Sequence, residues 1–186
     1  MLTSNYPGMK RILAAILVMG CIAFFTSCGK SPASMNKQIA GLEQEIKAVS
    51  PADTAKVNEL IAVYEQYASE FPKDTLSPEY LFRAGGMCLS FNKPSRSLEI
   101  FRRVCRNYPQ YKRAGECLFM QAFVFENALG DYDNAGKIYR EFITKYPGHP
   151  LADDAELSLK YLGKPAEAIL RDMELQAADS TSGAIK

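Results

Sequence analysis

The sequence lacks tryptophan and contains a single histidine among its 186 residues. That residue, His149, lies in the segment Pro147-Gly148-His149-Pro150, and no motif pairs it with a nucleophile or an orienting group. Catalysis by a histidine base needs such partners close by, and a metal site needs clustered ligands. We therefore predict that His149 is a solvated loop residue, that the protein is not an enzyme, and that it holds no metal or cofactor.

Neither sign of charge predominates, because 22 Lys and Arg face 21 Asp and Glu. Without residues 1–28 the counts become 20 and 21, and the formal net charge is −1. A nucleic-acid-binding protein shows a basic face, whereas here acids and bases alternate along the predicted helices as on ordinary solvated surfaces. We therefore exclude nucleic acid as a partner.

Long hydrophobic runs are also missing. The apolar segment from Ile12 to Phe25 has 14 residues, too few to span a bilayer as a mature helix. It follows Lys10 and Arg11 and precedes Thr26-Ser27-Cys28, which is the order of a secretory signal with basic, apolar and small-residue regions. The signal peptide is therefore predicted over residues 1–28, with Met9 as a plausible true start.

The end of this segment resembles a bacterial lipobox. The resemblance implies that the thiol of Cys28 receives a diacylglycerol and its freed amine a third acyl chain, an anchor that is effectively permanent. Val18-Met19-Gly20-Cys21 is a rival lipobox, but cleavage there leaves an apolar N-terminus, whereas cleavage at Cys28 leaves the polar leader 29–34 as a short linker. A soluble secreted protein and an uncleaved anchor are the remaining interpretations.

Three further cysteines, Cys88, Cys105 and Cys117, lie on predicted helices without CxxC or metal-like spacing. An odd number of cysteines in an oxidising compartment leaves at least one unpaired. We predict buried free thiols, with a Cys88–Cys117 bridge as the alternative.

One nine-residue phrase that ends in an aromatic residue and a proline occurs three times. The copies are Tyr64-x-x-Tyr67-x-x-x-Phe71-Pro72, Phe101-x-x-Val104-x-x-x-Tyr108-Pro109 and Tyr139-x-x-Phe142-x-x-x-Tyr146-Pro147. Their first residues lie 37 and 38 positions apart, and a period of 20 to 50 residues is the signature of a stacked repeat protein.

Each phrase is predicted to lie on the second helix of a helical hairpin, because its apolar residues recur at helical spacing and the proline ends the helix. Ser77 is predicted as the N-cap of the helix that precedes the middle copy, with Pro78 in its first position. The other predicted helices cover residues 34–49, a segment from about 53 to 71, 115–127, 135–146, 151–162 and 166–176. Residues 177–186 are small and polar and are predicted to form a flexible tail.

This pattern of helix pairs resembles the tetratricopeptide repeat. The second repeat matches the family pattern at Ala84, Gly85, Cys88, Ser97, Phe101 and Pro109, and the third at Ala122, Phe125, Ala135, Tyr139 and Pro147. The resemblance implies an all-α fold, a right-handed superhelix of about four hairpins over residues 35–176. It also implies that the first helices of the hairpins line a groove.

The candidate partner-binding groove that the resemblance implies is made of Phe82, Glu116, Phe119, Phe123, Glu126 and Asn127. An apolar strip flanked by acids suits an extended or helical polypeptide. The alternative is that the phenylalanines pack within the superhelix.

Long links after the proline corners and an N-terminal lipobox are similar to the tetratricopeptide-repeat lipoprotein of the outer-membrane β-barrel assembly machinery. The Tol-Pal-associated periplasmic tetratricopeptide-repeat protein shares the corner. The resemblance implies a lipid-anchored periplasmic scaffold for other envelope proteins, held on the outer membrane because Gly29 is not the aspartate of inner-membrane retention. The alternative is an accessory lipoprotein that captures ligands or glycans for nutrient uptake.

Overall fold

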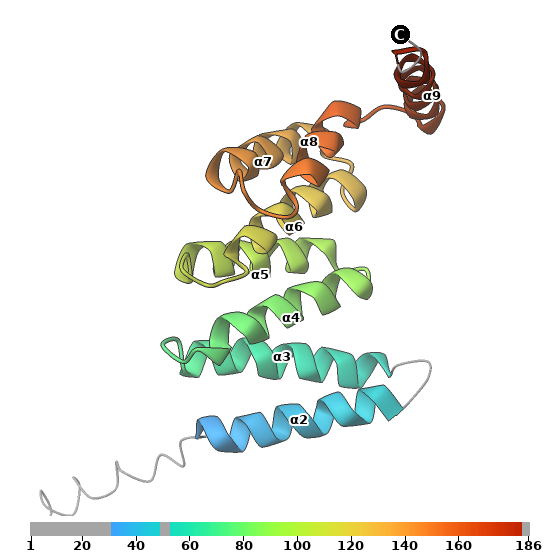
Figure 1. The fold of residues 1–186 in the computed structure, drawn as a ribbon. Coiled ribbons are helices and arrows are strands. Elements are labelled where there is room, and N and C mark those ends of the chain that lie inside the picture. Colours follow the sequence, from blue (N-terminus) through green and yellow to red (C-terminus); the bar gives the residue numbers. More distant parts are fainter. Residues whose placement is uncertain (1–30, 49–52, 184–186) are drawn as a thin grey trace, which may run out of the picture.

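The computed structural model describes residues 31–48 and 53–183, which form eight helices and no strand. The helices are α2 (Pro32–Ala48), α3 (Thr54–Glu70), α4 (Leu76–Ser90), α5 (Pro94–Asn107), α6 (Ala114–Asn127), α7 (Tyr132–Lys145), α8 (Ala152–Tyr161) and α9 (Ala166–Gly183). From α2 to α8 each helix packs on the next, so that the chain rises as a stack of antiparallel hairpins (Figure 1). The fold is all-α and superhelical, as predicted.

The predicted signal peptide, with Cys21 and Cys28, lies outside the described residues. Within the part of the chain that the structure describes, no helix has the length and apolar character needed to cross a membrane.

The three aromatic-proline corners have the same backbone geometry. Phe71, Tyr108 and Tyr146 each cap the preceding helix with φ between −134° and −123° and ψ between 55° and 58°, and each N–H donates to a carbonyl four residues earlier at 2.8 Å. The residue three positions after each aromatic then donates its N–H back to the aromatic's carbonyl at 3.0 Å. Because the proline blocks further helix, this turn reverses the chain in the same way each time.

Ser77 is not the N-cap of α4, contrary to the sequence prediction. The helix begins at Leu76 after Thr75, and the Leu76 N–H donates instead to the Asp74 carboxylate at 2.8 Å. The Ser77 side chain is buried and donates its hydroxyl to the Phe71 carbonyl at 2.6 Å. The Phe71 carbonyl also accepts the Asp74 N–H at 3.0 Å, so the buried serine adds a second hydrogen bond that ties the start of α4 to the corner.

Most other helix ends lie within a few residues of prediction, and the end of α9 is the exception. α7 starts at Tyr132 because Asp131 accepts a hydrogen bond from the Asn134 N–H at 3.1 Å. α9 continues past Gln176 to Gly183, since no proline or glycine interrupts the sequence before that glycine. Flexibility of residues 177–186 stays a prediction.

The first aromatic of each phrase lies in the core, as the repeat pattern predicted. Tyr64 is 2% exposed, and Phe101 and Tyr139 are 0% exposed. Phe101 of α5 reaches the backbone of α4 at Gly85, where an added Cβ would lie 2.7 Å from the ring. The Ser97 hydroxyl donates to the Gly85 carbonyl at 2.8 Å and joins the two helices at the same point.

Replacing Phe101 by Ala is expected to cost about 3–5 kcal/mol of unfolding free energy, because it empties a fully enclosed site. For a chain of this size the melting temperature then falls by on the order of 10 °C. Lys137→Ala, on the exposed face of α7, is the control and is expected to shift it very little. Equal small shifts in a thermal melt would show that the repeat register is wrong.

Gly85 and Gly86 offer a matched pair for the close approach of α4 and α5. Gly85→Ala is expected to lower the melting temperature because its Cβ meets the buried Phe101 ring, while a Cβ at Gly86 meets nothing within 4 Å. Gly86→Ala is expected to raise stability by about 0.5–1 kcal/mol through helix propensity. Chemical denaturation of both variants measures the difference, and a Gly85→Ala protein as stable as Gly86→Ala would contradict the packing.

Candidate functional site: a groove across the first helices

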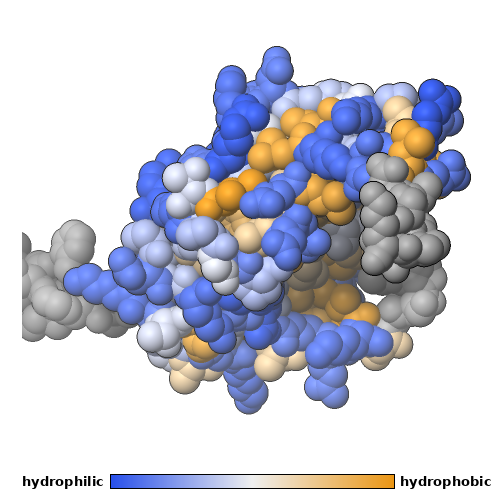
Figure 2. Space-filling model, turned by 45° about the horizontal axis from the view of Figure 1, so that its top comes forward, coloured by the Kyte–Doolittle hydropathy of each residue, from blue (hydrophilic) through white to orange (hydrophobic). Residues whose placement is uncertain are grey.

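A groove of about 540 Å³ opens between α2, α3 and α4, with Arg113 at its border next to α6. Its floor is apolar and is formed by Ile46, Leu60, Phe82, Met87 and Phe91. Its border is charged and is formed by Glu43, Lys47, Glu79, Arg83 and Arg113. In the space-filling view, hydrophobic side chains lie in a hollow of the surface between hydrophilic borders (Figure 2).

Helical spacing presents these side chains together. On α4, the residues Glu79, Phe82, Arg83 and Gly86 follow one another at i, i+3, i+4 and i+7, so they share one face. α2 is the first helix of the first hairpin, and its residues Glu43, Ile46 and Lys47 face the same groove. The groove therefore spans the first helices of two neighbouring hairpins.

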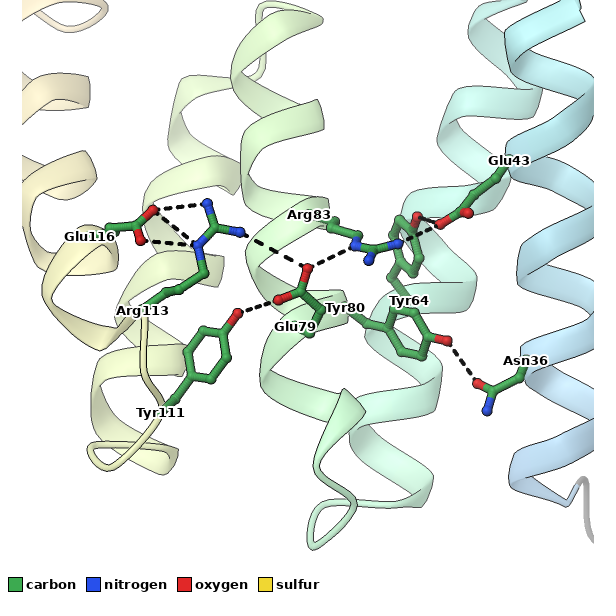
Figure 3. A network of polar contacts seen from close by, with 9 residues as sticks. All are labelled: Asn36, Glu43, Tyr64, Glu79, Tyr80, Arg83, Tyr111, Arg113 and Glu116. Carbon is green, nitrogen blue, oxygen red and sulfur yellow. Dashed lines mark hydrogen bonds and ion pairs between the residues drawn. The ribbon is translucent and has the colours of Figure 1, made fainter.

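Arg83 links α4 to α2 across the groove. Its Nη1 donates to Glu43 Oε1 at 2.9 Å, and its Nε donates to Glu79 Oε1 at 3.0 Å (Figure 3). Tyr64 of α3 donates its hydroxyl to the same Glu43 carboxylate. Burial, together with this bond, raises the pKa of Tyr64 above its ordinary value, so the phenol stays protonated and keeps donating.

Glu79 is the centre of the network. Tyr111, in the corner before α6, donates its hydroxyl to Glu79 Oε2 at 2.6 Å. Partial burial works to raise the pKa of the Glu79 carboxyl, but the hydrogen bonds from Tyr111 and Arg83 outweigh it and the pKa is lowered. Glu79 is therefore ionised at neutral pH.

Arg113 extends the network to α6 and covers part of the apolar floor. Its guanidinium donates to both oxygens of Glu116, with Nη2 at 2.8 Å from Oε2, and lies 4.0 Å from Glu79. Its Cζ is 3.5 Å from the centre of the Phe82 ring, a cation–π contact. The remaining border charge, Lys47, makes no hydrogen bond or ion pair with the side chains of the described ranges.

The six sequence-predicted groove residues do not gather in one place. Phe82 lies in the groove floor, and Glu116 holds Arg113 at its border. Phe119 packs edge-on against Tyr139 and Phe142 of α7, with ring centres 5.5 and 5.6 Å apart.

The other three predicted residues lie further along α6. Phe123 is 37% exposed, and Asn127 is exposed and donates to the Phe123 carbonyl at 3.2 Å. Glu126 accepts the hydroxyl of Tyr139 at 2.8 Å. A partner-binding role for the six together stays a prediction.

Sequence reasoning missed the α2 side of the groove and both arginines. The predicted groove residues all come from the second and third repeats, and none comes from the predicted helix over residues 34–49. Glu43, Ile46 and Lys47 lie at i, i+3 and i+4 on that helix, so helical spacing shows that they share a face. Arg113 precedes its helix, so no helical spacing identifies it.

His149 lies in the loop between α7 and α8, as predicted, but it is half-buried, so the prediction that it is solvated is wrong. Its ring lies edge-on to Phe142 with centres 5.3 Å apart, and its Nδ1 accepts the Leu151 N–H at 3.2 Å. Gly115 makes room for it, because a Cβ there would lie 3.1 Å from the imidazole. The histidine thus caps the corner, as Asp74 does in the first corner.

Cys88, Cys105 and Cys117 are free thiols, and Cys88 and Cys117 are buried. Burial raises the pKa of the Cys105 thiol to about 11, so it is protonated at neutral pH and a poor nucleophile. Among the residues that the structure describes, no group of three or more His, Cys, Asp or Glu side chains has a metal-binding arrangement.

Comparison with known proteins identifies the repeat. Residues 116–149 match the family model of the tetratricopeptide repeat; they span α6, α7 and the corner through His149. No curated protein matches the chain. The chain therefore carries a tetratricopeptide repeat at residues 116–149, within an all-α superhelical fold of the tetratricopeptide-repeat kind.

Proposed function

We propose that the protein is a noncatalytic, lipid-anchored scaffold of the bacterial periplasm, and that it binds a polypeptide segment of another envelope protein in the groove of α2, α3 and α4. Tetratricopeptide repeats are typically noncatalytic scaffolds that bind proteins or peptides. The observation that carries the proposal is an apolar floor open to solvent inside a charged border. Open apolar surface of this kind marks interaction sites.

The border suits a polypeptide because its charges, apart from Lys47, already have partners. Arg83, Glu79 and Arg113 satisfy one another, so apolar side chains can enter the floor without leaving a buried charge unpaired. Gly86 keeps the floor wide, since a Cβ there would meet nothing within 4 Å. The groove volume of about 540 Å³ lies in the usual range of ligand-binding clefts.

The membrane attachment in this proposal rests on Cys28 and the polar leader after it. With Gly29 after the lipidated cysteine, we place the protein on the periplasmic leaflet of the outer membrane. The corners and the lipobox resemble those of the tetratricopeptide-repeat lipoprotein of β-barrel assembly, and the Tol-Pal-associated tetratricopeptide-repeat protein shares the corners. On this resemblance we propose a role in outer-membrane protein assembly or in envelope constriction.

Cys28→Ala is expected to abolish palmitate labelling and to release the chain from the membrane pellet, because the acyl chains supply the attachment. Cys21→Ala is the control and is expected to leave both unchanged. The reverse result would move the cleavage site to Cys21. Digestion of the protein by protease added to intact cells would contradict a periplasmic location.

Gly86→Leu is expected to remove partner capture without lowering the melting temperature, since its Cβ meets nothing within 4 Å and the rest of the side chain extends into the open groove. Gly41→Leu is the matched control, because a Cβ at Gly41 also meets nothing within 4 Å and Gly41 lies outside the groove lining. The measurement is affinity capture of the detergent-solubilised, lipidated protein, with captured proteins identified by mass spectrometry.

Envelope assembly or division proteins lost only in Gly86→Leu would support the scaffold, and components of a glycan transporter would favour the uptake alternative. Capture that survives Gly86→Leu but is lost in the double variant Phe119→Ser, Phe123→Ser would move the site to α6.

A further inference from the structure

The fourth hairpin lacks the aromatic residue that closes the others. In the second and third hairpins Phe101 and Tyr139 follow the small residues Ser97 and Ala135 by four positions and are fully buried. Asp172 occupies this place in α9, four residues after Ala168. It accepts the Tyr161 hydroxyl at 2.7 Å and pairs with Lys160 at 2.9 Å. α9 is therefore attached to α8 by polar contacts at the surface instead of by a buried ring.

The apolar face of α9 is exposed to solvent as well. Ala166, Ile169, Leu170 and Met173 follow one another at i, i+3, i+4 and i+7. Leu170 is 59% exposed and Met173 is 45% exposed. An amphipathic helix gains most of its stability by packing such a face, but here Ile169 is only half-buried and Leu170 and Met173 stay exposed.

The open face of α9 and the groove of α2, α3 and α4 are complementary. Anchors at i, i+3, i+4 and i+7 are the pattern by which a helix binds in an apolar groove. Glu167 and Glu174 border the α9 face beside Leu170, and neither has an ion pair among the described contacts. Lys47, which has no ion pair among the described residues, has the opposite sign.

The two surfaces belong to opposite ends of the stack. α2 and α9 are the first and last of the described helices, with α5 to α7 between them (Figure 1). The groove of the same chain is therefore out of reach of α9, and their contact has to join two molecules.

We propose that α9 of one copy binds in the groove of a second copy, so that the protein associates with itself head to tail. The inference rests on the proposed function, since it uses the same groove as a polypeptide-binding site. The contact joins two different surfaces, so it is heterologous and adds further copies unless the rotation closes a ring. Anchoring on one membrane surface raises the effective concentration of the copies.

The experiment is analytical ultracentrifugation of the full lipidated chain in density-matched detergent over a range of concentrations. The unmodified protein is expected to gain mass with concentration. Leu170→Glu is expected to weaken association about tenfold or more, because it removes a buried leucine from the contact. Leu175→Glu is the matched control: Leu175 is 62% exposed on the opposite side of the same helix, and association is expected to be unchanged.

A mixture of two variants gives the decisive result. Gly86→Leu keeps α9 but fills the groove, whereas Leu170→Glu keeps the groove but damages α9, so each alone is expected to stay monomeric. Mixed in equal amounts they are expected to form a one-to-one dimer that grows no further.

A monomeric unmodified protein at all concentrations, equal effects of Leu170→Glu and Leu175→Glu, or a mixture that stays monomeric would each overturn the proposal. The proposed function fails separately, if Gly86→Leu leaves partner capture unchanged. If the groove captures another envelope protein while the chain stays monomeric, the proposed function stands and the proposal of self-association is wrong.

Discussion

Each of the first three hairpins of this protein depends on one aromatic side chain of its second helix that reaches the first helix. Tyr64 donates to Glu43 of α2, Phe101 packs on Gly85 of α4, and Tyr139 donates to Glu126 of α6. The three rings are almost fully buried, and because protein interiors are close-packed, displacing a ring would lose packing contacts in its hairpin. This contact orients the first helices and so determines which of their faces is left for the groove.

The groove shows how a repeat stack combines rigidity with an open surface. The border network joins α2, α3, α4 and the corner before α6 through Glu43, Tyr64, Arg83, Glu79 and Arg113 (Figure 3). Exposed ion pairs contribute little to stability, and their effect here is to fix the positions of the groove walls. The floor stays open because Gly86 supplies no side chain and Arg113 covers only Phe82.

Several features of the fold could be predicted because they depend on local chemistry. The spacing of Tyr64, Phe101 and Tyr139 placed all three correctly in the core, and the prolines after the aromatic residues placed the corners. The failures occurred where a side chain found a partner outside its own helix. Ser77 has the sequence of an N-cap but satisfies the Phe71 carbonyl, and His149 lies in a loop but fills space beside Gly115.

The sequence by itself determined the helices, the repeat period, the corners and the buried aromatic positions, since each follows from residues within one or two turns of each other. Only the tertiary structure decided which first-helix residues share a groove. Lys47, Phe82 and Arg113 come together because the superhelix brings neighbouring hairpins into contact, and no local spacing records the rotation from one hairpin to the next. The same holds for α9. The sequence shows that Asp172 stands in place of an aromatic residue, but only the structure shows that Asp172 bonds to Tyr161 of α8 and that the apolar face of α9 stays exposed.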